Sequence, residues 1–178
     1  MKIIVFGASG SGTTTLAKSL AERLSFRHLD VDDFYWVQTA VPFQIKIARS
    51  QRVANLRNAM EACDNAVVSG SLISWGDYFC DAFDLAIFLT LPRETRMERL
   101  KHRELERYGD RLFSDPDLKA QSKAFLDWAR EYDNPLFSGR NIAKHKKWAE
   151  SLACKCVEIG DLTNEQRIDI VISVIDPK

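Results

Sequence analysis

The segment Gly7-Ala8-Ser9-Gly10-Ser11-Gly12-Thr13-Thr14-Thr15 is the part of the sequence most suited to chemistry. Its three glycines allow successive backbone N–H groups to turn toward a single anion, and three hydroxyls follow directly. The spacing fits the motif G-x-x-x-x-G-K-[ST], whose backbone cradles the phosphates of a nucleotide. We therefore expect a nucleotide-binding loop in which Gly7, Ser9, Gly10, Ser11, Gly12, Thr13, Thr14 and Thr15 contact the phosphates.

One position of this loop departs from the motif. Thr13 stands where the motif has lysine, whereas Thr14 is placed to offer its hydroxyl to Mg²⁺. A charge-assisted hydrogen bond contributes about 1.5–3 kcal/mol, so the missing ammonium weakens phosphate binding without removing the contribution of the backbone amides. The transition state of phosphoryl transfer loses more, because the motif's lysine neutralises charge on the β- and γ-phosphates. Fast transfer therefore requires another cation.

Three carboxylates, Asp30, Asp32 and Asp33, follow the second predicted strand. The carboxyl ends of parallel strands meet at one edge of a sheet, so these acids should face the same crevice as the loop. Asp30 is best placed to hold Mg²⁺ with Thr14, and Asp32 to orient and deprotonate an acceptor hydroxyl. Asp33 contacts the substrate or caps the following turn, and any of the three could instead be a solvated turn acid.

Four arginines recur at spacings of three and four residues on one predicted helix: Arg96, Arg99, Arg103 and Arg107. That spacing places them on one face, where like charges repel unless an anion compensates. One interpretation is a lid that closes over the nucleotide, with Arg99 or Arg103 supplying the charge missing at Thr13. The other is a surface helix whose arginines pair with Glu104 and Glu106.

Four further residues are candidate substrate contacts. Arg49 and Arg52, in the helix expected after the second strand, bind an acidic group of the acceptor or belong to a solvated helix face. Gly70 follows the third predicted strand and permits close approach of a substrate to the backbone. Trp75 forms a wall of the acceptor pocket or packs in the core.

Short apolar stretches alternate with helical patterns along the whole chain. Strands are expected at residues 2–6, 28–30, 65–69, 85–90 and 154–159, and helices from 14 onward and at 44–63, 93–108, 117–131 and 142–152. Thr163 and Gln166 form a capping box that starts a last helix. This order predicts an α/β fold with a doubly wound, five-stranded parallel sheet. Residues 1–178 should form one domain, in which 93–152 is a lid and helical excursion.

Composition excludes several classes of partner. Lys plus Arg and Asp plus Glu number 25 each, so no bulk positive charge exists to hold a nucleic acid or an anionic membrane. The longest apolar runs, about five or six residues, are far shorter than the ~20 needed to span a bilayer. Four cysteines without a disulfide framework indicate a reduced, cytoplasmic protein, and Cys154 and Cys156 are expected to be buried free thiols.

The chain resembles the small-molecule kinases of the P-loop class, which include adenylate-kinase-like nucleoside monophosphate kinases, shikimate kinases and riboside kinases. Its loop matches their phosphate-binding segment except at Thr13. Asp30-Val31-Asp32 is similar to the Asp-x-Asp of shikimate kinases, and Asp32-Asp33-Phe34-Tyr35 to a stretch of riboside kinases. Ser69-Gly70 departs from the Asp-Gly or Gly-Gly-Gly of these families, which moves metal binding toward Asp30.

The resemblance implies an ATP-dependent, Mg²⁺-assisted phosphotransferase acting on a small metabolite such as a nucleoside, nucleotide or hydroxy acid. Asp32, Arg99 and Arg103 would then be its catalytic residues, in a monomer or homodimer. The alternative is a non-catalytic or very slow nucleotide-binding or regulatory protein, in which Thr13 marks lost chemistry. A polynucleotide 5′-hydroxyl kinase is disfavoured by the zero net charge.

Overall fold

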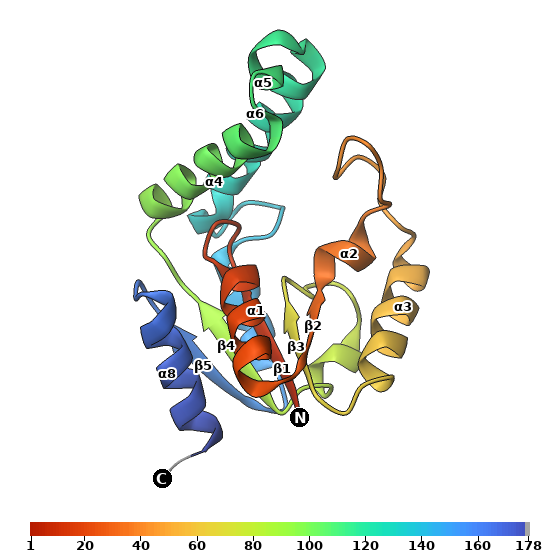
Figure 1. Ribbon diagram of the computed structural model, residues 1–178, viewed down its shortest axis with the longest axis vertical. Coiled ribbons are helices and arrows are strands. Elements are labelled where there is room, and N and C mark those ends of the chain that lie inside the picture. Colours follow the sequence, from red (N-terminus) through yellow and green to blue (C-terminus); the bar gives the residue numbers. More distant parts are fainter. Residues whose placement is uncertain (177–178) are drawn as a thin grey trace.

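A five-stranded parallel sheet forms the centre of the computed structural model, which describes residues 1–176. The strands are β1 (Lys2–Gly7), β2 (Arg27–Asp30), β3 (Ala66–Ser69), β4 (Leu85–Leu89) and β5 (Lys155–Ile159), in the order β2-β3-β1-β4-β5 (Figure 1). The three inner strands are almost entirely buried, as strands covered on both faces must be. The predicted fold class is confirmed.

Helices cover both faces of the sheet. On one face lie α1 (Thr13–Leu24) and α8 (Asn164–Ile175), whose Leu16, Leu20 and Val171 are fully buried. On the other lie α3 (Arg49–Glu61) and α7 (Ile142–Glu150). Burying a large apolar side chain contributes about 1.5–3 kcal/mol, so these two layers stabilise the strand ends that carry the predicted site.

Local signals fix where the helices begin. Thr163 and Gln166 form the predicted capping box of α8. Asp30 caps a short helix that was not predicted, α2 (Val31–Tyr35), by accepting a hydrogen bond from the backbone N–H of Asp32. Gly12 adopts a left-handed conformation immediately before α1, so the loop runs directly into the helix N-terminus.

The helical excursion projects beyond the carboxyl ends of the strands. It contains α4 (Arg93–Tyr108), α5 (Arg111–Ser114) and α6 (Pro116–Arg130), followed by a 3₁₀ turn η2 (Glu131–Asp133) (Figure 1). A small core of Met97, Leu100 and Ala129 joins α4 to α6. The chain then returns to the sheet through α7, so the projecting part is shorter than the predicted range of residues 93–152.

One predicted helix differs from the structure, and one short element was not predicted. The helix predicted from Gln44 starts only at Arg49, because the preceding residues fold back on α2. There Ile45 accepts from the N–H of Val37 at 2.8 Å, and the N–H of Ile47 donates to Tyr35 at 2.9 Å. The 3₁₀ turn η1 (Asp77–Cys80) was not predicted either.

The thiols also differ from expectation. Cys154 and Cys156 are half-buried rather than buried, and both are free. Burial raises the pKa of the Cys156 thiol to about 11, and negative charge on Cys154 and Glu158 acts in the same direction. That thiol therefore stays protonated and unreactive at neutral pH. Among the helices of residues 1–176, none has the length and apolar character needed to cross a bilayer.

Candidate functional site

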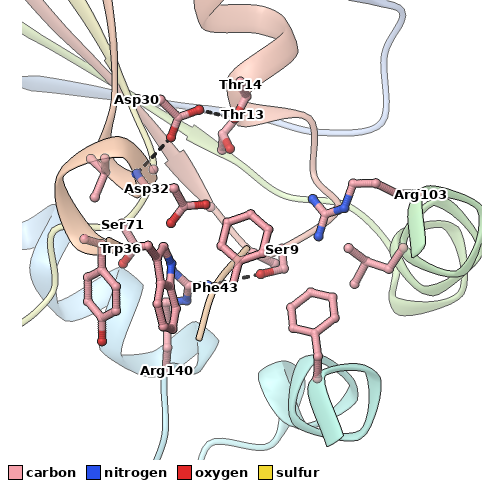
Figure 2. Close-up of a pocket in the computed structure, with 18 of the residues that line it drawn as sticks. Ser9, Thr13, Thr14, Asp30, Asp32, Trp36, Phe43, Ser71, Arg103 and Arg140 are labelled. Carbon is pink, nitrogen blue, oxygen red and sulfur yellow. Dashed lines mark hydrogen bonds between the residues drawn. The ribbon is translucent and has the colours of Figure 1, made fainter. Parts of the chain in front are cut away.

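A cavity of about 1320 Å³ lies at the carboxyl ends of the strands, between the helical excursion and α2. Figure 2 shows side chains from several distant segments pointing into it. The predicted site residues that line it are Gly7, Ser9, Gly10, Gly12, Thr13, Thr14, Thr15, Asp30, Asp32, Asp33, Gly70, Trp75, Arg99 and Arg103. The structure therefore brings most of the predicted residues together in one place.

The phosphate loop is shaped by its glycines. Gly10 and Gly12 have φ angles of 83° and 91°, which only glycine adopts without strain. A Cβ on Gly7 would lie 2.5 Å from the carbonyl oxygen of Leu89, and one on Gly10 would lie 2.7 Å from that of Arg96. The side chain of Ser11 does not line the cavity, because it is buried and donates to the Ala8 carbonyl at 2.8 Å. Close backbone packing at Gly7 and Gly10 therefore fixes the conformation of the loop.

Thr14 and Asp30, the residues predicted to hold Mg²⁺, lie next to each other. The Thr14 hydroxyl donates to Asp30 Oδ2 at 3.1 Å, while Asp30 Oδ1 accepts from the N–H of Asp32 at 3.0 Å (Figure 2). Hydroxyl and carboxylate oxygens are ligands that suit Mg²⁺, which usually binds through one or two carboxylates plus substrate phosphates. Within residues 1–176 no group of three His, Cys, Asp or Glu side chains could hold a metal. A magnesium ion at Thr14 and Asp30 would therefore take its other ligands from water and from a bound phosphate.

Asp32 opens on the middle of the cavity, opposite the guanidinium of Arg103 (Figure 2). Asp32 is exposed to the cavity, but the protein atoms around it displace part of its hydration, and this desolvation raises the pKa of its carboxyl group above the ordinary value. The negative charge of Asp30 acts in the same direction, whereas Arg140 and Arg103 oppose the rise. A carboxylate with a raised pKa is a stronger proton acceptor, as a general base requires.

The arginines of α4 divide into two groups. Arg99, Arg103 and Arg107 line the cavity, as a lid requires. Arg96 does not, because it is fully buried at the base of α4, where Nε donates to the Leu91 carbonyl at 3.1 Å and Nη2 pairs with Asp133 at 2.5 Å. The expectation that all four share one functional face was therefore wrong. Arg96 instead anchors the start of the excursion.

Arg103 is held against an apolar surface. Its guanidinium lies 5.6 Å from the ring centre of Phe125 on α6. Burial lowers the pKa of Arg103, and the neighbouring charge of Arg107 lowers it further. Arg107 in turn is paired with Glu104 at 3.2 Å, in line with the alternative of a salt-linked helix for this one arginine. Arg99 and Arg103 therefore keep their charges available to the cavity.

Two arginines that line the cavity were not predicted from the sequence. Arg140 donates through Nη2 to Ser9 Oγ at 3.1 Å and lies 5.0 Å from the ring centre of Trp128 (Figure 2). Arg167 on α8 donates to the carbonyl of Ser11 at 3.1 Å. Nothing distinguishes Arg140 within its polar stretch. Arg167, however, precedes the buried Val171 by four residues, and a charge on the predicted core face of a helix was a usable signal.

The cavity is positively charged although the chain is neutral overall. Seven basic side chains line it, against four acidic ones. The basic residues are Lys46, Arg99, Arg103, Arg107, Arg140, Lys144 and Arg167, and the acidic ones are Asp30, Asp32, Asp33 and Glu104. Such a cavity concentrates anions, because low-dielectric walls focus the field of the charges that line them.

Aromatic side chains form the wall of the cavity opposite the lid. Tyr35, Trp36, Phe43 and Trp75 all line it. Arg52 stands behind this wall, with its guanidinium 4.2 Å from the ring centre of Tyr35 and 5.1 Å from that of Trp75. Arg52 therefore supports the wall rather than lining the cavity. Arg49 is exposed at the start of α3 and does not line it either, so neither prediction of direct substrate contact is supported.

A buried polar chain lies under the cavity. His145 Nε2 is 3.0 Å from Ser71 Oγ, and His145 Nδ1 is 2.6 Å from the hydroxyl of Tyr132. Burial, followed by the charge of Arg140, lowers the pKa of His145 to about 3, so its ring is neutral at physiological pH. Ser71 lines the cavity, and this chain therefore fixes the position of its hydroxyl. Neither His145 nor this arrangement was predicted from the sequence.

Comparison with known proteins shows the family of the chain. A family model described as "AAA domain" matches residues 3–120. The protein YqaC of Bacillus subtilis (strain 168), described as uncharacterized, is 37% identical over 174 residues, which cover 97% of this chain and 96% of YqaC. The cytidylate kinase of Pyrococcus furiosus is 34% identical over 113 residues, which cover 57% of each protein. The sequence similarity to that kinase is thus confined to just over half of either chain.

Solved structures extend the similarity to the whole fold. The shikimate kinase of Bacteroides thetaiotaomicron superposes with a TM-score of 0.58 at 14% identity, covering 98% of both chains. The shikimate kinase of Acinetobacter baumannii in complex with shikimate gives a TM-score of 0.55 at 14% identity, covering 98% of this chain and 92% of that one. At these identities the likeness shows a shared fold.

Proposed function

Because this chain belongs to the AAA-domain family of P-loop proteins, we propose that it is an ATP-dependent, Mg²⁺-assisted phosphotransferase acting on a small metabolite. The observation that carries this proposal is the joint placement of four groups in one cavity. The phosphate loop, the Thr14–Asp30 pair and the carboxylate of Asp32 face the same space as Arg103. That is the set of groups that phosphoryl transfer needs: a phosphate cradle, metal ligands, a base and a cation.

The proposed reaction assigns one role to each group. The loop backbone and the N-terminus of α1 bind the phosphates of the donor. Asp32 orients the acceptor hydroxyl and takes its proton as the acceptor oxygen bonds to the γ-phosphorus and the bond to the leaving ADP breaks. Arg103 stabilises the charge on the transferring group. Thr14 and Asp30 would hold Mg²⁺, which when bound supplies positive charge to the phosphate oxygens.

The side chains that line the cavity also indicate which class of acceptor it would bind. Tyr35, Trp36 and Phe43 offer flat apolar surface, and Arg140 and Lys46 offer positive charge beside it. Aromatic faces suit a planar or ring-shaped substrate, and the cations suit a phosphate or carboxylate attached to it. A nucleotide or a cyclic hydroxy acid satisfies both conditions. Cytidylate kinase, which is similar to this chain in sequence, and shikimate kinase, which is similar in fold, are named for substrates of these same two classes.

A second candidate function rests on Thr13. Without the lysine, the loop could bind a nucleotide and transfer its phosphoryl group slowly or not at all, which describes a regulatory nucleotide-binding protein. The two proposals predict the same affinity for Mg-ATP and differ only in turnover. They are therefore separated by a measurement of product rather than of binding.

The test combines calorimetry with an acceptor panel. Mg-ATP and Mg-GTP are titrated into the protein, and ADP or GDP release is then followed with nucleoside, nucleoside monophosphate and carbocyclic hydroxy acid acceptors. Release above the acceptor-free rate supports the phosphotransferase. Binding without release across the whole panel supports the regulatory protein. Absence of binding of either triphosphate contradicts both proposals.

A further inference from the structure

Arg167 occupies an unusual place for a charged residue. It lies on α8, in the layer that covers the sheet, and is only 3% exposed. Its Nη1 donates to the carbonyl of Ser11 at 3.1 Å, and its Nη2 donates to that of Gly160 at 3.0 Å. The guanidinium is therefore fixed between the phosphate loop and the turn that follows β5.

The charge of this guanidinium has no partner in the described structure. Within residues 1–176 no carboxylate lies at ion-pair distance from Arg167, and its buried Nε makes no hydrogen bond. A buried cation without a counterion destabilises a fold unless something else offsets its loss of hydration. Here the two backbone carbonyls hold the group in place, and Asp161 favours its charge only from beyond ion-pair distance, so neither neutralises it.

A second arginine faces the same point. If Gly12 carried a Cβ, that atom would lie 3.4 Å from Arg167 Nη1 and 3.9 Å from Arg99 Nη1. Both residues line the cavity, and the charge of Arg99 disfavours the charge of Arg167. Two guanidinium groups held beside one glycine repel each other unless an anion lies against both. Gly12 is directly followed by Thr13, the position at which the motif's cation is absent.

We propose that Arg167 and Arg99 together replace the missing lysine by binding the phosphates of the nucleotide at Gly12. Arg167 is the fixed member of the pair, held by Ser11 and Gly160, and Arg99 is the member carried by the lid helix α4. This inference rests on the proposed function, since it assumes that a nucleotide occupies the loop. It changes the expectation from sequence, in which Arg99 or Arg103 alone compensated for Thr13.

The positions of the cavity arginines decide between these assignments. Arg103 interacts with the charge of Asp32 and lies against Phe125, which places it toward the acceptor side. Arg140 is tied to Ser9 and also interacts with Asp32. Only Arg99 and Arg167 are within 4 Å of the Cβ position at Gly12. The pair at Gly12 is thus assigned to the donor, and Arg103 and Arg140 to the transferring group and the acceptor.

The test measures nucleotide affinity in variants of the full chain. Arg167→Gln and Arg99→Gln should each weaken Mg-ADP and Mg-ATP binding about 10- to 100-fold, because each removes a charge-assisted contact. Adenosine, which has no phosphate, should bind equally well to the wild type and to both variants. Arg23→Gln is the matched control, since Arg23 is exposed at the opposite end of α1 and should leave every affinity unchanged.

Reintroducing the lysine gives the decisive comparison. Thr13→Lys should restore most of the lost ADP affinity to Arg167→Gln and to Arg99→Gln, but should add little to the wild type, which already has the charge. Arg167→Lys, which keeps the charge, should retain most of the affinity. If Arg167→Gln does not fold, the nucleotide affinities of Arg167→Lys and of Arg99→Gln are compared instead. Each of these two variants is then measured with and without Thr13→Lys.

Three results would overturn the proposal. One is wild-type ADP affinity in Arg167→Gln and Arg99→Gln. A second is an equal loss for adenosine and ADP, which would mean that Arg167 only supports the nucleoside side of the cavity. The third is failure of Thr13→Lys to restore binding in either variant. A wild-type protein that binds no nucleotide at all would instead contradict the proposed function.

Discussion

The two walls of the cavity are built in different ways. The phosphate loop uses one continuous segment, residues 7–15, and acts through backbone geometry set by glycines. The second wall, which faces the loop, uses side chains from α2, α4, α6 and the turn before α7, which are separated by about a hundred residues of chain. The first wall can therefore be recognised in a short stretch of sequence, whereas the second exists only once the chain has folded.

This difference assigns different work to each wall. A backbone cradle binds phosphate whatever molecule carries it, because the N–H groups contact only the anion. Under the proposed function, the side chains of Trp36, Phe43 and Arg140 would distinguish acceptors, because they would meet the part of the substrate that varies. Changes in the first wall should therefore alter stability or donor binding, and changes in the acceptor-facing side chains of the second wall should alter turnover and its pH dependence.

The largest effect is expected at Asp32. Asp32→Asn removes the proposed base, so turnover should fall about 10²–10⁴-fold while Mg-ATP affinity stays close to that of the wild type. The folded protein raises the pKa of Asp32, so ionising this residue opposes folding at neutral pH. Asp32→Asn should therefore unfold at equal or higher urea concentration than the wild type at pH 7.

Asp169→Asn is the matched control, because Asp169 is an exposed carboxylate on α8 outside the cavity. It should leave turnover, affinity and stability unchanged. Near-normal turnover in Asp32→Asn would remove the base from the proposed mechanism. A parallel loss of stability and turnover would mean that Asp32 supports the fold instead.

The fold could be predicted from sequence because its determinants are local. The apolar stretches that became β1, β3 and β4, the capping box of α8 and the glycines of the loop each act over a few residues. The helix expected from Gln44 failed for the opposite reason. Residues 36–47 pair with each other and with α2, and that tertiary contact overrides the local helical pattern.

The candidate site was predictable only in part, for the same physical reason. The sequence locates the ends of β1 and β2, and the segments at and just after these ends contain Thr14, Asp30 and Asp32. Arg140 and Arg167 reach the loop from residues that lie more than a hundred positions away, and Arg49 points elsewhere although its spacing looked suitable. Spacing along one helix predicts a shared face, but it does not say what that face meets.

An intermediate effect is expected where the phosphate loop packs against the lid. Gly10→Ala should lower the free energy of unfolding by about 2–4 kcal/mol, since it combines a left-handed backbone with a Cβ 2.7 Å from the Arg96 carbonyl. Gly109→Ala is the matched control, because Gly109 also has a positive φ but a Cβ there meets nothing within 4 Å. It should cost only about 1 kcal/mol.

Urea denaturation of both variants isolates the contact from the backbone strain. A clear excess for Gly10→Ala means that the loop is clamped by the base of α4. Equal losses would show that the loop can move away from α4, which would contradict a loop whose geometry is held by backbone packing.

The smallest effect concerns the pH dependence of turnover and depends on Arg103 of the lid helix α4. Arg103 favours the ionised form of Asp32, so removing its charge should raise the pKa of Asp32 further. A general base acts when deprotonated, so the acidic limb of kcat/KM, where activity rises with pH, should move to higher pH in Arg103→Gln.

Lys101→Gln is the matched control, because Lys101 lies on α4 but lines a different hollow from Asp32. An acidic limb that stays in place while turnover falls would mean that Arg103 contacts only the phosphoryl group. A limb that moves to lower pH would contradict the electrostatic link between the lid and the proposed base.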